Sequence, residues 1–430
     1  MAGRLRSLRL IGLLAITATC FTPVAQKLAS TPTEVNMAAG DTVSIPMAGA
    51  RVSSSSNQQV ATASSESSSA LTVTSTSPGN ADISTRIFGL IPWKTHVHVT
   101  PSTKVVVGGQ AVGIRLQSKG PIVVGFRQLA DGSSPSAKAH IQVGDMIIAI
   151  DRHVIHSAAD LQRALENAKE PVHVTVERGS VRRELDVSAP NQSPGNRHQL
   201  GLYVRDRTVG VGTLTFYDPP RHTFGALGHI ITDTDTGQAV VGSGGLYSAM
   251  ITGLKPGRIG SPGEKRGTFS TSSDQLGRIG RNTPYGVFGT MIKPPSSCDV
   301  NQLVQVALPE QVHEGPAKMF TVVHGQKVEA FNVQIDNVAR QSAPATKSMI
   351  VKVTDPRLLA ETGGIIQGMS GSPLVQDGKL VGAVTHVFVS DPTRGYAVYA
   401  MWMVHQAKFD TDLQPTFHYY PFLNHSKQAV

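Results

Sequence analysis

Hydrophobic and polar positions alternate along most of the chain in short stretches that glycines interrupt. The stretch Val172–Val176 and the stretch Ile91–Val99 both show a period of two, which predicts half-buried β-strands. Helical spacing of apolar residues is clear only over Ser157–Ala168. Beyond Leu200 the pattern continues as short strands and glycine turns, which is typical of β-barrels. The pattern therefore predicts a mainly β protein.

The 430 residues exceed the length of one ordinary domain. We expect a small β-rich module over residues 29–101, with a flexible Ser-rich insertion at 53–69. A second domain is expected over residues 103–190, and a Pro/Asn/Gly-rich linker over 190–196 follows it. Residues 195–425 are expected to form the last domain, a β-barrel or a pair of barrels.

The N-terminal residues 1–25 have the pattern of an export signal or a short membrane anchor. Arginines at positions 4, 6 and 9 precede an apolar run from Leu10 to Phe21. That run is shorter than the roughly 20 apolar residues of a comfortable membrane-spanning helix. We therefore expect this segment to direct the chain out of the cytoplasm.

Charge and cysteine content exclude several classes of function. The net charge is +9, but the basic residues are dispersed and no basic run is interleaved with aromatics, so we expect no nucleic-acid partner. A membrane surface stays possible as a partner. The two cysteines, Cys20 and Cys298, form no zinc-binding spacing, and Cys20 lies in the apolar leader. We expect no metal, no cofactor and no disulfide within the mature chain.

Residues 103–190 resemble a PDZ domain. A glycine loop leads into a strand near Ile114, and the signature Gly144-Asp-Met-Ile-Ile-Ala-Ile150 precedes the expected helix. A PDZ domain binds an extended peptide or a free C-terminus beside one of its strands. The positions of this chain that match that groove are Val112, Gly113, Ile114 and Leu116. A PDZ-shaped domain that serves only as a rigid spacer is the alternative.

The segment Gly368–Pro373, which reads Gly-Met-Ser-Gly-Ser-Pro, has the frame of a serine-peptidase nucleophile. Its glycines allow positive φ angles and leave room for a substrate carbonyl. The amides of Gly368 and Ser370 can then stabilise an oxyanion while the Ser370 hydroxyl attacks. An ordinary Gly/Ser/Pro loop between two strands is the alternative interpretation.

A serine nucleophile needs a base, and His229 is the leading candidate. It follows Phe224-Gly-Ala-Leu-Gly228, a short apolar segment with glycines that is typical of a buried strand end. His386, on the strand after the serine turn, is the rival. We prefer His229 because two-barrel serine peptidases place the base in the first barrel and the nucleophile in the second.

The orienting carboxylate is expected to be Asp355, fifteen positions before the serine, which gives the chain order His, Asp, Ser. An Asp-Pro pair is also a common turn starter. Asp233, Asp336 and Asp391 are the competitors.

Four longer segments resemble the stage IV sporulation protein B peptidases. They are Leu200–Asp218, Phe224–His229, Thr354–Pro373 and Val381–Pro392. The order of exported N-terminus, PDZ domain and peptidase is also that of this family. The resemblance implies that His229, Asp355 and Ser370 act as base, orienting carboxylate and nucleophile. In two-barrel peptidases generally, the carboxylate lies much further before the serine.

The family resemblance also implies a biological setting. Its members act between the two membranes around a developing endospore, where they cut a membrane-bound regulator so that a late sigma factor becomes active. They also process themselves under the control of the PDZ domain. The sequence thus predicts a PDZ domain followed by a chymotrypsin-like, two-barrel serine endopeptidase. A non-catalytic PDZ adaptor and an HtrA-like quality-control protease are the alternatives.

Overall fold

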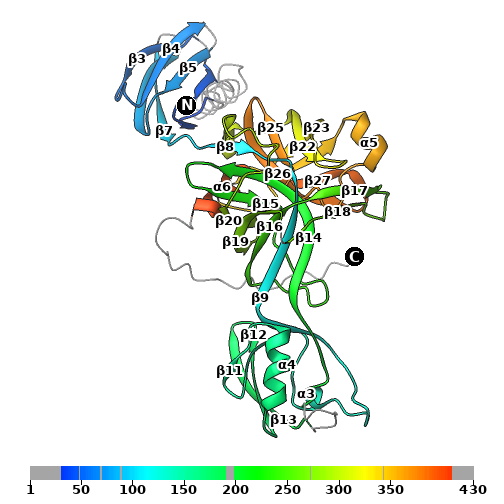
Figure 1. Ribbon diagram of the computed structural model, residues 1–430. Coiled ribbons are helices and arrows are strands. Elements are labelled where there is room, and N and C mark those ends of the chain that lie inside the picture. Colours follow the sequence, from blue (N-terminus) through cyan, green and yellow to red (C-terminus); the bar gives the residue numbers. More distant parts are fainter. Residues whose placement is uncertain are drawn as a thin grey trace, which may run out of the picture. The chain divides into compact units, whose positions relative to one another are not determined.

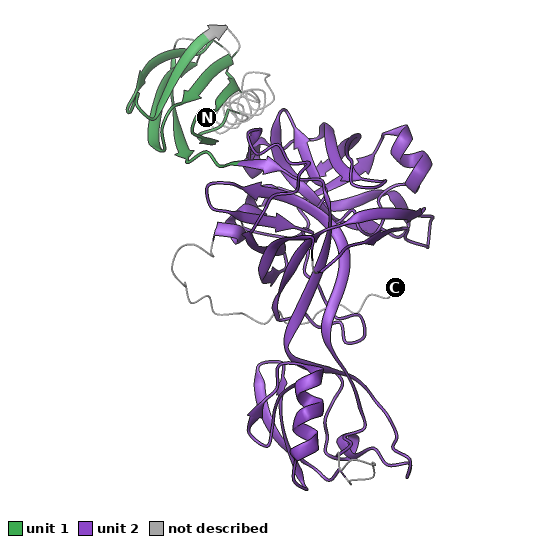
Figure 2. Ribbon diagram, viewed as in Figure 1, with its two compact units in different colours: residues 1–104 green, residues 105–430 purple. Residues whose placement is uncertain are grey.

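The computed structural model describes residues 31–408, apart from 48, 68–69, 88–89, 190–197, 272 and 342. The chain divides into two compact units, residues 1–104 and 105–430 (Figure 2). The predicted leader 1–25, its Cys20 and the predicted linker 190–196 lie outside the described residues. Within the part of the chain that the structure describes, no helix has the length and apolar character needed to cross a membrane.

The first unit is a β module with two sheets around one core. One sheet has the strand order β1-β7-β6-β3 and the other has the order β2-β5-β4. Leu71, Ile83 and Val97 come from both sheets and are completely buried in the shared core. The strands are β1 (Glu34–Ala38), β2 (Thr42–Pro46), β3 (Arg51–Ser55), β4 (Ala61–Ser67), β5 (Ala70–Ser75), β6 (Gly79–Ile87) and β7 (Ile91–Thr100).

The expectation of a flexible insertion at 53–69 is wrong. Most of this segment belongs to β3 and β4, which pair with β6 and β5 respectively. Val60 and Ala61 are buried in the core of the module, and the Ser55 hydroxyl donates a hydrogen bond to the Ala61 carbonyl at 2.8 Å. Serine-rich composition hid the strands because the side chains that face solvent carry no hydrophobic signal.

The second unit contains a first ring of six strands in which each pairs with the next: β9-β16-β19-β20-β15-β14, with β14 returning to β9. Leu116, Leu246 and Val287 are fully buried in its core. Its members are β9 (Ala111–Phe126), β14 (Leu202–Asp218), β15 (Thr223–Ala226), β16 (Gly242–Ser248), β19 (Gln275–Thr283) and β20 (Gly286–Met291), and β8 (Lys104–Val107) pairs with β14 outside the ring.

The PDZ-like region lies in sequence between β9 and β14. Its helix α4 (Ala158–Asn167) is capped by the Ser157 hydroxyl, which accepts a hydrogen bond from the Asp160 amide, so the predicted helix is confirmed. Ile147 and Val174 are buried beneath it. The other elements are α3 (Pro135–Lys138), β10 (Met146–Ile150), β11 (His153–Val154), β12 (Val172–Arg178) and β13 (Val181–Val187).

Two long strands join this region to the first barrel. β9 and β14 run antiparallel beside each other over most of their length, from the pair Leu202–Phe126 to the pair Thr213–Ala111 (Figure 1). The start of β9 and the end of β14 are barrel strands, whereas their other halves belong to the PDZ-like core. The PDZ-like region is therefore inserted into the first barrel.

This arrangement corrects the expected peptide groove. Val112, Gly113, Ile114 and Leu116 lie on the barrel half of β9, where β14 covers one edge of the strand and β16 covers the other. Val112, Ile114 and Leu116 are buried in the barrel core. A peptide cannot be added to a strand whose two edges are already paired. The groove of this PDZ-like region is thus not made by these four residues.

The second barrel closes through the order β22-β23-β24-β27-β26-β25. The two six-stranded barrels confirm the predicted two-barrel architecture. The strands are β22 (Gly315–Val322), β23 (Val328–Val338), β24 (Met349–Val353), β25 (Pro373–Gln376), β26 (Lys379–Phe388) and β27 (Asp391–Tyr399). The remaining elements are the hairpin β17 (Met250–Lys255) and β18 (Glu264–Thr268), β21 (Leu303–Gln305), η1 (Pro309–Gln311), α5 (Pro356–Thr362) and α6 (Ala400–Lys408).

Candidate active site

The turn that carries Ser370 follows α5 and enters β25, and strands of both barrels hold it. The Gly371 amide donates to the Val384 carbonyl of the second barrel at 2.7 Å, and the Thr213 amide of β14 donates to the Ser370 carbonyl at 3.0 Å. Gly371 has a φ of 90°, and a Cβ there would collide with the Thr213 carbonyl and the Leu227 backbone. A glycine is thus required after the serine.

Two carbonyl contacts fix the peptide planes that carry the predicted oxyanion donors. The Gln367 carbonyl accepts a bond from the Lys265 amide, and the Met369 carbonyl accepts one from the Ser372 amide, both at 2.9 Å. Because a trans peptide is planar, each bond directs the following N–H, of Gly368 or Ser370, to the opposite side. Among the described residues, neither of these two N–H groups donates a hydrogen bond. They are therefore free to bind an oxyanion.

The Ser370 hydroxyl donates a hydrogen bond to the Thr385 carbonyl of β26 at 2.8 Å. A side chain with this bond is held at a defined rotamer, and its proton is directed to the Thr385 carbonyl rather than to a ring nitrogen. Attack on a substrate therefore requires the hydroxyl to turn from Thr385 to a base.

His229 follows β15 through two residues with positive φ, Leu227 and Gly228, both at 71°. A Cβ on Gly228 would lie 3.0 Å from the Thr385 methyl group. The bend at Leu227 and Gly228 therefore packs against β26, the strand whose Thr385 carbonyl accepts the Ser370 hydroxyl. His229 Nδ1 lies 2.8 Å from the Ile230 carbonyl. A carbonyl only accepts, so Nδ1 carries the proton and Nε2 keeps its lone pair. Burial lowers the pKa of His229, which favours this neutral form.

The rival base, His386, follows Thr385 directly, and its ring centroid lies 5.0 Å from that of His229. Burial and then the neighbouring charges of His229 and Lys347 lower the pKa of His386. No hydrogen bond fixes a tautomer of His386 among the described residues. His386 directly follows the residue that accepts the Ser370 hydroxyl, the His229 ring lies beside that of His386, and only His229 has a defined acceptor nitrogen.

Asp355 is the N-cap of α5. Its side chain accepts hydrogen bonds from the amides of Arg357 and Asn332 at 3.0 and 3.1 Å and forms an ion pair with the Arg357 guanidinium. The Arg357 hydrogen bond is the main reason that the pKa of Asp355 is lowered to about 2. No contact between Asp355 and a histidine is present in the described part of the chain, so its predicted role as orienting carboxylate stays a prediction.

The competing aspartates are also engaged elsewhere. Asp233 pairs with Arg205, and Asp336 and Asp391 both pair with Arg394. In the described residues the Ile230 carbonyl, rather than a carboxylate, holds the His229 ring. Sequence reasoning missed Ile230 and the Thr385 acceptor because a backbone carbonyl leaves no signature in the sequence.

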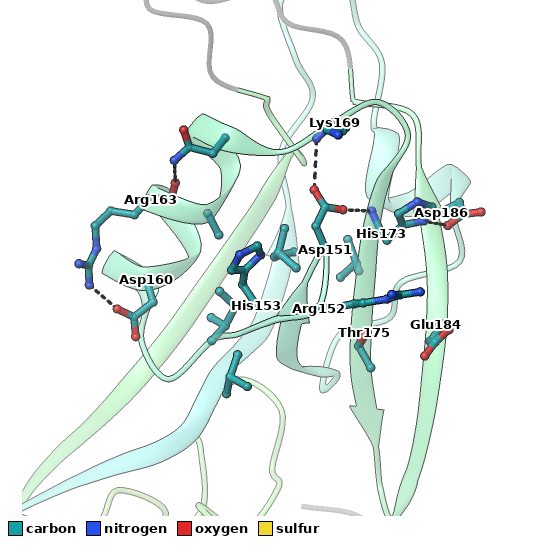
Figure 3. Close-up of a pocket in the computed structure, with 16 residues that line it drawn as sticks. Asp151, Arg152, His153, Asp160, Arg163, Lys169, His173, Thr175, Glu184 and Asp186 are labelled. Atoms are coloured by element: carbon teal, nitrogen blue, oxygen red, sulfur yellow. Dashed lines mark hydrogen bonds and ion pairs between the residues drawn. The ribbon is translucent and has the colours of Figure 1, made fainter.

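A separate hollow of about 1000 Å³ lies in the PDZ-like region, between α4 and strands β12 and β13 (Figure 3). Its polar groups bind one another: His173 pairs with Asp186 at 2.6 Å, and Asp160 pairs with Arg163. The Asp151 carboxylate accepts the amides of Lys169 and His173. Among the described residues that line the hollow there is no serine or cysteine, so it offers a surface for contact rather than a second serine or cysteine nucleophile.

The fold and this site define a serine peptidase that carries a PDZ domain. The model of the SpoIVB peptidase S55 family matches residues 196–404, and that of the PDZ domain matches residues 111–189. The match over residues 196–404 confirms the resemblance to this family that was inferred from the sequence motifs.

Two solved structures are similar to parts of the chain. The active form of the Rv3671c protease from M. tuberculosis is 16% identical, with a TM-score of 0.27, and the match covers 49% of this chain and 78% of that one. The inactive form of the Rv3671c protease is 15% identical, with a TM-score of 0.25, and the match covers 47% of this chain and 85% of that one. A search of curated proteins found no match.

Proposed function

We propose that the protein is an exported serine endopeptidase that cleaves a membrane-associated regulatory protein, and itself, in a sporulation signalling pathway. That pathway would end in the activation of a late sigma factor. The peptidase family and its name support this proposal, as does the basic and apolar leader of the sequence. The observation that carries the chemistry is the turn at Ser370: the amides of Gly368 and Ser370 are free, and Gly371 packs against Leu227, two residues before His229.

In the proposed reaction, His229 Nε2 takes the Ser370 proton as the hydroxyl oxygen attacks the scissile carbonyl carbon. The Gly368 and Ser370 amides bind the oxygen that becomes negative in the tetrahedral intermediate. His229 then returns the proton to the leaving amine as the C–N bond breaks. A water molecule, deprotonated by the same nitrogen, hydrolyses the acyl-enzyme and restores the serine.

The Ile230 carbonyl supports this cycle because it keeps the Nδ1 proton in place. A carbonyl dipole stabilises the imidazolium that forms after proton transfer less than a full carboxylate charge does. Asp355 is the carboxylate that the family resemblance proposes for that role. To reach it, Asp355 would have to exchange its bonds to Arg357 and Asn332 for one to His229.

The partners that we propose are a membrane-bound protein substrate, a peptide or C-terminus bound by the PDZ domain, the chain itself and a membrane surface. The site of action would be the space between the forespore and mother-cell membranes, with the protein tethered or released. The PDZ-like region is inserted in the barrel that carries His229, which supports a role in controlling cleavage.

Two other functions lead to different outcomes in the same test. A PDZ adaptor that binds without cutting would be unaffected by the loss of Ser370. An HtrA-like quality-control protease would digest unfolded proteins at many sites, whereas a regulatory peptidase makes one or two cuts.

The test compares the purified full chain with Ser370→Ala, incubated alone and followed by intact mass. We expect discrete fragments from the wild type and none from the variant, whose circular dichroism should match the wild type. Labelling with a fluorophosphonate, which reacts at an activated serine, should also be lost in Ser370→Ala. Equal processing or equal labelling of the two proteins would refute the assignment of Ser370.

A further inference from the structure

Lys265, on β18, is a buried cation that the proposed reaction does not use. Only 3% of the residue is exposed, and among the described residues no carboxylate pairs with it. Its register partner on β17 is Leu254, and the groups around its side chain are hydroxyls and glycine backbone rather than charges. Burying an unpaired ammonium group is costly, so its presence behind the serine turn calls for a function.

The ammonium group begins a network of hydroxyls that ends at the serine turn. Lys265 Nζ donates to Thr321 Oγ1 at 2.7 Å, and Thr321 Oγ1 also accepts a bond from Ser372 Oγ at 3.0 Å. Ser372 Oγ lies 3.5 Å from Thr213 Oγ1, which donates to the Gly368 carbonyl at 2.9 Å. Thr213, Thr321 and Ser372 are completely buried. Water therefore cannot replace a bond that is lost.

Lys265 also contacts the turn directly. Its amide donates to the Gln367 carbonyl at 2.9 Å, and its Cβ lies 3.0 Å from the position that a Cβ of Gly368 would occupy. Consequently both peptide planes next to Gly368 depend on Lys265, one through its backbone and one through its side chain. The first plane carries the Gly368 N–H itself, and the second fixes the Gly368 carbonyl, so the two bonds together hold Gly368 in one conformation.

We propose that Lys265 is a positioning residue of the peptidase, which acts through Thr321, Ser372 and Thr213 to hold the Gly368 amide toward the oxyanion. This inference rests on the proposed roles of Ser370 and Gly368. Lys265 touches neither the substrate nor the nucleophile. It stabilises one arrangement of the turn, and its removal leaves the serine and the base in place while the oxyanion donor loses its alignment.

The pKa of Lys265 provides a readout that a purely structural residue would lack. Burial is the cause that lowers this pKa to about 7. The positive charge is thus lost near neutral pH, and the neutral amine donates a weaker hydrogen bond to Thr321, so labelling of Ser370 should lose rate above that pH. The histidines near the serine, His229 and His386, have pKa values lowered from 6.5 and so titrate on the acidic side.

The experiment measures the saturating rate constant and the half-saturation concentration for fluorophosphonate labelling of the full chain. Lys265→Met should lower the rate constant about 10- to 100-fold, less than the loss of a whole oxyanion donor, and change half-saturation by less than about 3-fold. Thr321→Val should have the same effect, and Thr321→Ser, which keeps the hydroxyl, should restore the rate. Lys318→Met, at an exposed lysine of β22, is the matched control.

Three results separate the possible failures. If Lys265→Met and Thr321→Val both label within 3-fold of the wild type while Ser370→Ala does not label, Lys265 has no positioning role and the proposed function stands. If Ser370→Ala labels like the wild type, both proposals are overturned. If Lys265→Met does not fold, the labelling rates of Thr321→Val and Thr321→Ser test the positioning role instead. Equal rates for those two variants overturn it.

Discussion

The two sides of the candidate active site are held in different ways. On the nucleophile side, both barrels and the hairpin β17–β18 bind the turn through buried backbone and hydroxyl groups. On the base side, a single bond from Nδ1 to the adjacent Ile230 carbonyl fixes the His229 ring. The proposed oxyanion donors thus lie in a turn that several buried bonds hold, whereas one hydrogen bond holds the ring of the proposed base.

This difference suggests which step needs precision. An oxyanion hole works because its dipoles are oriented before charge develops, so its frame must resist displacement. A general base needs a lone pair, a suitable pKa and access to the hydroxyl, which one carbonyl and partial burial supply. The Ser370 hydroxyl, bound to Thr385, must move in either case.

The largest effect should come from breaking the base side. We expect His229→Ala to lower kcat/KM, or the fluorophosphonate labelling rate, by about 10³-fold or more, because the serine loses its proton acceptor. His386→Ala should cost less than about 10-fold. The labelling rates of the two variants, measured side by side, identify the base. A larger loss of rate in His386→Ala than in His229→Ala would make His386 the base.

The next effect concerns stability on the nucleophile side. Folding lowers the pKa of Lys265 from 10.5 to about 7, so between these values the unfolded chain binds more protons and stability increases with pH. From pH 7 to 9 the wild type should gain about 2 kcal/mol of unfolding free energy relative to Lys265→Met. Urea unfolding of both proteins at each pH measures the difference. Parallel pH dependences would show that the lysine is accessible to water and titrates normally.

A smaller effect is expected from Asp355→Asn. The wild-type carboxylate has a lowered pKa, so its contribution is present above about pH 4 and lost as the pH falls toward 2. Asparagine can keep the helix cap, but loss of the ion pair with Arg357 and of the oxygen that accepts the Asn332 amide should cost about 1–2 kcal/mol at pH 7. If the bonds of Asp355 to Arg357 and Asn332 define its role, labelling of Ser370 should fall less than about 10-fold. A loss near that of His229→Ala, without a matching loss of stability, would instead make Asp355 the orienting carboxylate.

The smallest effect should come from Thr215→Ser. Thr215 Oγ1 donates to the Gly371 carbonyl at 2.8 Å, and serine keeps that hydroxyl. Only a buried methyl group is removed, so we expect about 1 kcal/mol of destabilisation and an unchanged labelling rate. A large drop in rate would mean that packing, rather than hydrogen bonding, holds the turn.

Several features followed from the sequence. The Gly-Met-Ser-Gly-Ser-Pro segment around Ser370 predicted its turn. The alternation of apolar residues predicted the strands, and the helical spacing over Ser157–Ala168 predicted α4. These are local properties, because a tight turn, a strand or a helix imposes its demands on neighbouring positions in the chain. The long motifs also identified the peptidase family, which the family match confirmed.

Other features depended on contacts between distant segments. Nothing in the pattern around Ile114 indicated that β14 and β16 would cover both edges of its strand, and so the expected groove was misplaced. Lys265 precedes Ser370 by more than one hundred positions and looks like an ordinary lysine in the sequence. Its proximity to the turn arises only when the hairpin β17–β18 packs beside Gln367.

By itself, the sequence determined the class of chemistry. The reactivity of the serine and the candidate histidines, and the backbone freedom of the glycines, are properties of the residues themselves and can be read at their positions in the chain. Only the tertiary structure decided which groups serve them: the Ile230 carbonyl at His229, the Thr385 carbonyl at Ser370 and the hydroxyl network of Lys265. The physical reason is that a hydrogen bond depends on distance and direction. Those quantities are set by how strands pair and barrels pack, and they are not encoded in any single segment.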